Sequence, residues 1–410
     1  MDLVLKNIGL LATPTGTSAV TGAEQRDITL ISDAEIGIRD GKIVYAGKAQ
    51  EPSPYPAAAK IIDCGGRLVT PGLVDAHTHL VFGGWRQKEL ALKLEGKSYL
   101  EILKSGGGIL STVEHTRAAS ESELTDKGRA LLAEMLMFGV TACEAKSGYG
   151  LSVNDELKQL RVIRTLDITQ PVDIVPTFMG AHAIPKEYSD DRAGYINLIL
   201  TEMLPAVMRE QLAEFCDIFC ETAVFTPEES LHILLEAKKH GLIPKIHADE
   251  IDPIGGAEIA AKCNAISAEH LIQATDDGIR SMAEQNVIAV LLPATSFYLD
   301  KPFARARDMI NAGVAVAIAT DFNPGSSPCL NMQFAMNLAC LKYKMTPAEV
   351  LTAATLNGAA AINLAETHGS LDVGKHADIV IWEAPDLEYI FYRYGSNLVK
   401  NVIKNGVVSY

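Results

Sequence analysis

The sequence lacks the features that mark several broad classes of protein. It has no run of about 18 apolar residues, the length a membrane-spanning helix needs. Residues 1–11 have no basic region followed by an apolar stretch, so we expect no signal peptide and a cytoplasmic location. Lys and Arg number 36 against 51 Asp and Glu, for a net charge of −15. With no basic cluster, this charge disfavours nucleic acid as a partner and favours solubility.

Cysteines are few and irregularly placed. The seven are an odd number and lack the paired spacing of a structural zinc site. Cys216 and Cys220 are the nearest pair, but their apolar surroundings favour buried, reduced thiols. The composition, 48% hydrophobic and 21% charged over 410 residues, is that of a globular chain able to bury a large core.

Alternating strands and helices dominate the chain from about residue 67 onward. Short apolar runs alternate with amphipathic stretches, the pattern of repeated βα units around a parallel sheet. Helix signals support this division: Thr226 to Glu229 predicts an N-cap followed by proline, and His240-Gly241 an end. Eight such units predict an α/β fold with a (β/α)₈ barrel over residues 67–367. The expected strands are Leu68–His79, Val140–Lys146, Val172–His182, Asp217–Ala223, Ile243–Asp249, Ala265–Leu271, Val287–Thr295 and Val314–Asp321.

The two ends of the chain have a different pattern. Glu35 to Arg39 and Lys42 to Ala46 flank Asp40-Gly41, which predicts a hairpin without helices. Strand-like runs return near the C-terminus, with Asn405-Gly406 as a turn. We therefore predict that residues 1–66 and 368–410 together form a small β-sandwich domain.

Five residues at predicted strand ends suggest a metal site. His77 and His79 are two apart on a strand, so both imidazoles point to one face. His247, His270 and Asp321 end three other strands. All five would meet at the C-terminal mouth of a barrel, where barrel enzymes place their chemistry. Nitrogen and oxygen ligands without cysteine favour a catalytic metal site over a structural one.

These positions lie in longer segments that resemble a known family. The chain is similar to the amidohydrolase superfamily and, more narrowly, to the imidazolonepropionase family. The segments that carry the resemblance are Pro71–His79, Val81–Arg86, Ser105–Ile109, Glu144–Gly150, Phe178–His182, His247–Glu250, His270 and Ala319–Ser326. The resemblance implies hydrolysis of the cyclic amide of 4-imidazolone-5-propanoate to N-formimidoyl-L-glutamate in histidine degradation. It also implies a homodimer with a small-molecule substrate.

The expected number of metal ions depends on whether the fourth strand has a residue that could bridge two ions. Binuclear superfamily members bridge two ions with a carbamylated lysine or an acidic residue on the third or fourth strand. The fourth strand here has no lysine, Lys146 lies on the second, and the resemblance assigns no ligand role to Glu221. We therefore expect one Zn²⁺ or Fe ion per chain, both metals suiting this donor set. The expected ligands are His77, His79, His247 and Asp321.

A substrate with a propionate group needs a cation or free backbone N–H groups. Arg86, in the loop after the first strand, has a guanidinium that could hold a carboxylate. We expect Ser327 and Pro328 to begin a helix whose free N–H groups could receive an anion. The resemblance adds ring and side-chain contacts from other residues. The expected substrate-binding residues are Arg86, Tyr149, His182, Glu250, Asn323, Gly325 and Ser326.

Three residues are expected to carry the chemical step. Asp321, assisted by Glu250, would take the proton of a metal-activated water, and His270 would polarise the ring carbonyl. Two alternatives share much of this constellation. One is a deaminase of a nucleobase-like heterocycle, and the other is a non-catalytic scaffold member of the fold, although such proteins typically lose metal ligands.

Overall fold

The computed structural model describes residues 2–50, 59–97 and 107–410, and its strands form two sheets. In the eight-stranded sheet, every strand pairs in parallel with the next one along the chain. This sequential parallel order is that of a (β/α)₈ barrel. Its strands are β5 (Leu73–Asp75), β6 (Val140–Lys146), β7 (Asp173–Ala181), β8 (Phe215–Cys220), β9 (Ile243–Ala248), β10 (Ser267–His270), β11 (Ile288–Leu291) and β12 (Val316–Ile318).

The barrel is closed just beyond the ends of β5 and β12. Asp321 N donates to His77 O at 3.1 Å, and His79 N donates to Phe322 O at 2.8 Å. Below them, Asp75 accepts hydrogen bonds from the N–H and the hydroxyl of Thr320 at 3.0 and 2.6 Å. The first and last strands are therefore joined where the chemistry was predicted.

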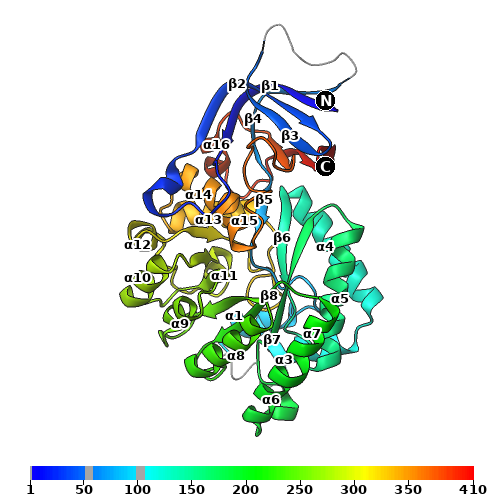
Figure 1. Cartoon of the computed structure of the whole chain (residues 1–410), viewed down its shortest axis with the longest axis vertical. Coiled ribbons are helices and arrows are strands. Elements are labelled where there is room, and N and C mark those ends of the chain that lie inside the picture. The colour runs from blue at the N-terminus through cyan, green and yellow to red at the C-terminus, as the bar shows by residue number, and fades with distance from the viewer. Residues whose placement is uncertain (1, 51–58, 98–106) are drawn as a thin grey trace.

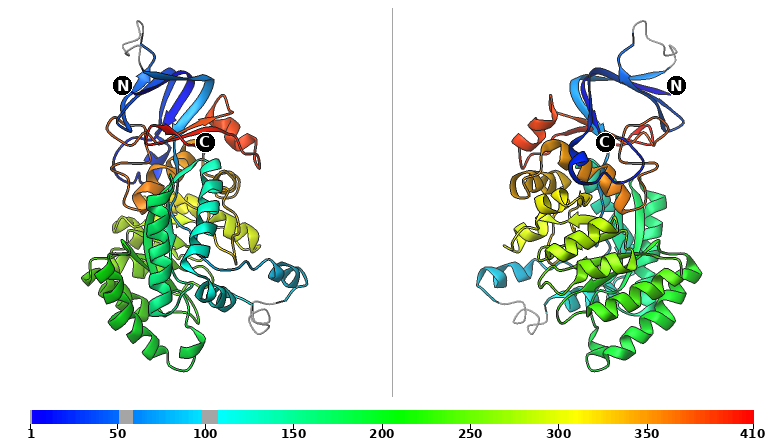
Figure 2. Two further views of the ribbon diagram at one scale, coloured as in Figure 1. Left: turned by 90° about the vertical axis from the view of Figure 1, so that its right-hand side faces the viewer. Right: turned by 60° about the vertical axis from the view of Figure 1, so that its left-hand side comes forward.

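Helices surround the barrel (Figures 1 and 2). Helix α8 begins as predicted, with Thr226 in a capping box with Glu229 and proline at the first position. No helix in the described part of the chain is long and apolar enough to cross a membrane. The α-helices are α1 (Lys88–Leu94), α3 (Ile109–Ala118), α4 (Glu121–Met137), α5 (Val153–Thr169), α6 (Arg192–Leu198), α7 (Leu204–Glu210), α8 (Pro227–Lys239), α9 (Gly256–Cys263), α10 (Asp276–Glu284), α11 (Pro293–Tyr298), α12 (Ala306–Asn311), α13 (Met332–Lys342), α14 (Pro347–Ala354), α15 (Leu356–Ala361) and α16 (Leu387–Tyr392).

The second sheet joins the two ends of the chain at one end of the barrel (Figure 1). Its seven strands run in the order β15-β14-β13-β4-β1-β2-β3. Its apolar core includes Leu5, Ile36, Val69, Ile379 and Ile403. The predicted fold class is thereby confirmed. The strands are β1 (Leu3–Thr13), β2 (Thr29–Arg39), β3 (Lys42–Lys48), β4 (Lys60–Pro71), β13 (Ile379–Trp382), β14 (Val399–Lys404) and β15 (Val407–Val408).

Three details of the prediction were wrong. The expected strand Leu68–His79 is two strands, since its first part belongs to β4 in the terminal sheet. The chain changes sheets at Gly72, where a Cβ would lie 2.2 Å from Thr141 Oγ1. The expected strand Val287–Thr295 ends early because proline starts α11. The terminal segments also contain α16 and a 3₁₀ helix, η1 (Gly22–Arg26).

Candidate active site

Four histidine and aspartate side chains meet at the C-terminal ends of the barrel strands. Nε2 of His79 lies 3.4 Å from Nε2 of His247. Asp321 Oδ1 lies 3.3 Å from Nε2 of His77 and 3.7 Å from Nε2 of His79. All four residues are at most 3% exposed. The strand ends therefore bring together the four residues expected to hold a metal.

The unpaired nitrogens of this cluster fit a cation. Neither ring nitrogen of His77 has a hydrogen-bond partner among the described residues, although both are buried. Burial lowers the pKa of His77 and of His79 well below the usual value, which leaves the imidazoles neutral and able to donate a lone pair. The Asp217 carboxylate instead raises the pKa of His247 above its usual value, although burial opposes this. Three imidazoles beside one carboxylate are a donor set that suits zinc or iron.

Two residues of the site have left-handed backbone conformations. The φ angles are 67° at His270 and 52° at Asp321. Such conformations are costly for residues other than glycine, and they gather at functional sites where the fold can hold them. They turn both side chains toward the same space: one ligand atom each from His77, His270 and Asp321 lies within 4.8 Å of the others.

Two carboxyl groups near the cluster have raised pKa values. Burial raises the pKa of Asp321 to about 6, although Thr295 Oγ1 donates to its Oδ2 at 2.6 Å. Glu250 Oε2 lies 3.6 Å from His270 Nε2. Burial, with a smaller effect from the Asp321 charge, raises the pKa of Glu250 to about 8. Carboxyl groups with such values can exchange protons near neutral pH.

A buried ionic network lies behind His247, and the sequence analysis missed its role. Asp217 Oδ2 is 3.1 Å from His247 Nδ1 and 2.7 Å from the ammonium of Lys146. Glu144 lies 2.5 Å from the same ammonium. Burial opposes charge on Asp217, yet His247 and Lys146 hold its pKa well below the usual value. Charged residues inside strands as apolar as β6 and β8 were the available signal.

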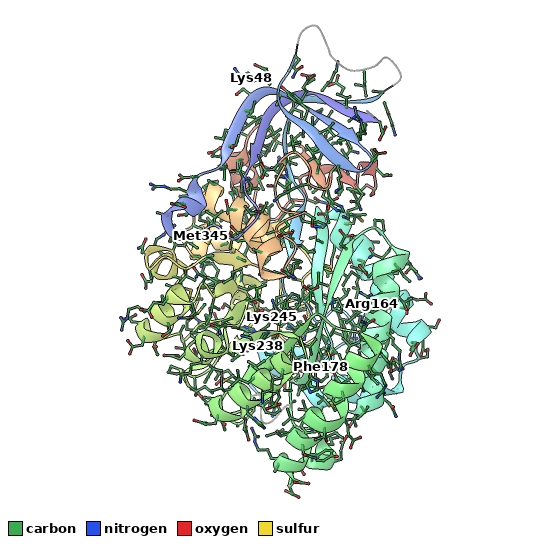
Figure 3. The ribbon with its side chains drawn as sticks, in the orientation of Figure 1. Lys48, Arg164, Phe178, Lys238, Lys245 and Met345 are labelled. Atoms are coloured by element: carbon green, nitrogen blue, oxygen red, sulfur yellow. The ribbon has the colours of Figure 1, made fainter. Side chains whose placement is uncertain are left out.

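A second buried lysine pairs with a carboxylate on neighbouring barrel strands. Lys245, labelled in Figure 3, lies 3.2 Å from Glu269 and donates to Ser267 Oγ at 2.8 Å. All three side chains are fully buried. The barrel interior thus holds paired charges as well as apolar residues.

Arg86 is held by a neighbouring acid. Its Nε and Nη2 atoms each donate to the carboxylate of Glu89 at 2.9 Å. Glu89 also accepts from the N–H of Gly108 at 2.7 Å. A Cβ on Gly325 would lie 2.2 Å from Nη1 of Arg86, so the guanidinium lies against the Gly325 backbone. The sequence motif indicates a role for Arg86, whereas its partner Glu89 is apparent only from the structure.

Tyr149 and His182 lie beside the metal-ligand candidates. The His182 ring stacks on His79, with centroids 4.9 Å apart, and the Tyr149 ring lies 5.2 Å from His182. Burial lowers the pKa of His182 to about 3, so its ring is neutral. Glu156, which the sequence analysis missed, accepts N–H bonds from Gly148, Gly150 and Leu151 at 2.8 to 3.2 Å. It thereby fixes the loop that carries Tyr149.

The loop after β12 differs from the expected helix start. Asn323 Oδ1 accepts the N–H groups of Gly325 and Ser326 at 2.8 and 2.7 Å. Ser327 does not cap a helix, because its hydroxyl donates to Thr320 O at 2.7 Å. Asn331 is the N-cap of α13 instead. The predicted helix start at Ser327 and Pro328 is therefore wrong, and two of the loop N–H groups are already bonded.

One predicted segment is described only in part. In Ser105–Ile109, the first two residues lie outside the described residues. Gly108 precedes α3 with a φ of 76°, a conformation that favours glycine.

Comparison with known proteins places the chain in a family. The model of the amidohydrolase family matches residues 68–408. The imidazolonepropionase of Bacillus velezensis is 54% identical over 99% of this chain and 96% of its own length. The chain belongs to the imidazolonepropionase family of amidohydrolases. Another member of this family, from Brevibacillus brevis, is 51% identical over 98% of this chain and 97% of its own length.

Solved structures outside that family share the fold. Escherichia coli guanine deaminase has a TM-score of 0.75 at 15% identity, covering 99% of this chain and 98% of its own. A zinc-bound adenosine deaminase from Xanthomonas campestris has a TM-score of 0.68 at 20% identity, covering 99% of this chain and 92% of its own. At these identities the likeness supports the barrel and terminal sheet only.

Proposed function

We propose that the protein hydrolyses the ring amide of 4-imidazolone-5-propanoate to N-formimidoyl-L-glutamate, a step of histidine degradation. The observation that carries the proposal is the pairing of Glu250 and His270 beside a buried cluster of three histidines and Asp321. Relatives more than 50% identical over almost the whole chain are imidazolonepropionases, which supports this substrate over others.

One metal ion belongs to this proposal. His77, His79, His247 and Asp321 would hold a single Zn²⁺ or Fe ion. When bound, such an ion supplies Lewis-acid chemistry that activates water near neutral pH. Lys146 is not free to bridge a second ion, because its ammonium lies between Glu144 and Asp217.

The chain's own carboxylates would move the protons. Asp321, assisted by Glu250, accepts a proton from the water that attacks the ring carbonyl carbon. Neutral His270 polarises the carbonyl oxygen, since burial holds the pKa of His270 well below the usual value. When the C–N bond breaks, the same carboxylates return the proton to the departing ring nitrogen. One water is consumed, and no other reactant is needed.

The remaining predicted residues would orient the substrate. Arg86 binds the propionate with the guanidinium edge that Glu89 leaves free. Tyr149 and His182 contact the ring and side chain. The turn that contains Asn323, Gly325 and Ser326 lies against Arg86, and its residues would contact the substrate beside that guanidinium.

We propose a cytoplasmic homodimer that acts on a small molecule, without nucleic-acid or membrane partners. In each chain, residues 67–367 would form the barrel domain, except that residues 67–71 belong to β4 in the terminal sheet, and residues 1–66 with 368–410 would form the β-domain.

A direct assay tests the proposal. Purified protein is incubated with freshly generated 4-imidazolone-5-propanoate, with and without a chelator, and metal content is measured. We expect hydrolysis that the chelator abolishes and about one metal ion per chain. Parallel incubations with guanine and cytosine, scored for ammonia, test deamination. Ammonia release without imidazolone hydrolysis would replace our proposal with a deaminase, and no metal and no turnover would favour a scaffold.

A further inference from the structure

The loop after β9 carries Glu250 and has little apolar anchorage next to that residue. The side chain directly after Glu250, Ile251, is 59% exposed, and the apolar anchor of the loop is Ile254, which packs partly buried against the core. The position of such a loop must come from hydrogen bonds more than from packing. Its backbone N–H groups therefore indicate what holds Glu250 in place.

Two of these N–H groups converge on one buried carboxylate. Ile251 N donates to Glu221 Oε2 at 2.7 Å, and Asp252 N donates to Glu221 Oε1 at 3.2 Å. Glu221 follows β8 and is 1% exposed. It has no Lys, Arg or His partner among residues 2–50, 59–97 and 107–410. Its carboxyl oxygens accept peptide N–H groups, that of Thr222 at 2.7 Å included, and the side chain points at the neighbouring loop.

The far end of the same loop is fixed separately. Asp249 accepts the N–H groups of Gly255, Gly256 and Ala257 at 2.9 to 3.0 Å, at the start of α9. Asp249 itself has a φ of 50°. Glu250 thus lies between two fixed points, of which only the Glu221 contact involves the residues directly after it.

We propose that Glu221 is a positioning residue, which holds Glu250 beside His270 by binding the two peptide N–H groups that follow Glu250. The inference rests on the proposed role of Glu250 in hydrolysis. Misplacing a reacting group by about 1 Å can cost on the order of 100-fold in rate. Removal of the carboxylate should therefore lower kcat more than it changes KM.

A double-mutant cycle tests this coupling. We expect Glu221→Ala to lower kcat by about 10- to 100-fold, with KM changed less than about threefold and metal content unchanged. In a Glu250→Gln background, Glu221→Ala should cost almost nothing more. Glu221→Gln keeps the shape of the side chain and one acceptor oxygen, so its kcat should lie between those of wild type and Glu221→Ala. This variant replaces Glu221→Ala in the cycle if the alanine variant does not fold.

Amide hydrogen exchange provides a readout independent of turnover. Exchange at Ile251 and Asp252 should accelerate in Glu221→Ala and stay slow in Glu250→Gln. Glu156→Gln is the matched control, since Glu156 holds the Tyr149 loop in a similar way, and it should change KM more than kcat.

Several results would overturn the inference. Additive losses in the double variant, loss of metal from Glu221→Ala, or unchanged exchange at Ile251 and Asp252 would each do so. If wild-type protein does not hydrolyse the imidazolone, the proposed function fails, and the exchange experiment still decides whether Glu221 holds the loop.

Discussion

Inside the barrel, Asp217 Oδ2 lies 3.1 Å from Nδ1 of His247. The same oxygen lies 2.7 Å from the Lys146 ammonium. A carboxylate behind a metal-binding histidine orients the ring and makes it more basic. Lys146 in turn keeps this carboxylate charged. The histidine expected to bind the metal is thus supported by two strands at once.

Replacing Asp217 should weaken metal binding. We expect Asp217→Asn to raise the metal dissociation constant by about 10- to 100-fold, because His247 loses its oriented, charged partner. Competition with a chromogenic chelator measures this constant. Glu144→Gln is the control, since Glu144 contacts Lys146 and is not paired with His247. Equal loss of affinity in the two variants would show that burial of Lys146, and not the orientation of His247, determines binding.

Removing the metal should destabilise the fold. A ligand that binds only the folded state contributes about 4 kcal/mol when present at 1,000 times its dissociation constant. We expect a chelator to lower the thermal midpoint by about 5 °C or more, and added Zn²⁺ or Fe²⁺ to restore it. Circular dichroism with temperature measures the change. His79→Ala should melt at the same temperature with and without chelator, and a chelator effect there would contradict the ligand assignment.

Gly325→Ala should impair substrate binding without unfolding the protein. The new Cβ would lie 2.2 Å from Nη1 and 2.8 Å from Cζ of Arg86, so the guanidinium must move away from Glu89. We expect KM to rise about tenfold or more, with kcat and thermal midpoint nearly unchanged. Steady-state kinetics and melting curves check this. Arg86→Lys should show a similar rise in KM, and a large fall in kcat alone would refute the placement of Arg86.

The ionic contact between Asp173 and Lys404 should make stability depend on acid pH. Burial alone would raise the pKa of Asp173, but the hydrogen bonds and charges of His368 and Lys404 lower it to about 2. The Asp173 side chain is 35% exposed, so we discount its contribution to about 1 kcal/mol. Because the folded pKa is lowered, this stability is present above about pH 4 and is lost as pH falls toward 2.

Urea unfolding of Asp173→Asn measures that contribution. The variant should be about 1 kcal/mol less stable than wild type between pH 5 and 7, with the difference shrinking below about pH 4. Asp27→Asn, which removes an exposed acid, should match wild type throughout. A difference between Asp173→Asn and wild type that does not change down to pH 3 would contradict the assignment.

The sequence predicted what depends on local periodicity. The range of β6 was predicted to the residue, and the His77 and His79 pair was placed correctly at the barrel mouth. The junction between β4 and β5 was missed because both are apolar, and only Gly72 separates them. Periodicity cannot tell which of two sheets a buried strand joins.

The supporting carboxylates were missed for a different reason. Glu156 and Glu221 bind backbone N–H groups. Because every residue except proline has a peptide N–H, the sequence does not indicate which of them a carboxylate will bind. Glu221 acts on a loop about 30 residues away. The same limit applies to Ser327, whose hydroxyl donates to the backbone carbonyl of Thr320 and not to the N-terminus of a helix.

Closure of the barrel between β5 and β12 has a consequence during synthesis. Two candidate ligands follow the first barrel strand, and Asp321 follows the last. The metal site therefore lies across the seam, the junction where β5 and β12 close the barrel. More than three quarters of the chain must be synthesised before the fourth candidate ligand, Asp321, is present. Tight metal uptake would then report that the seam has closed, and a nascent chain ending before Asp321 should bind the ion weakly.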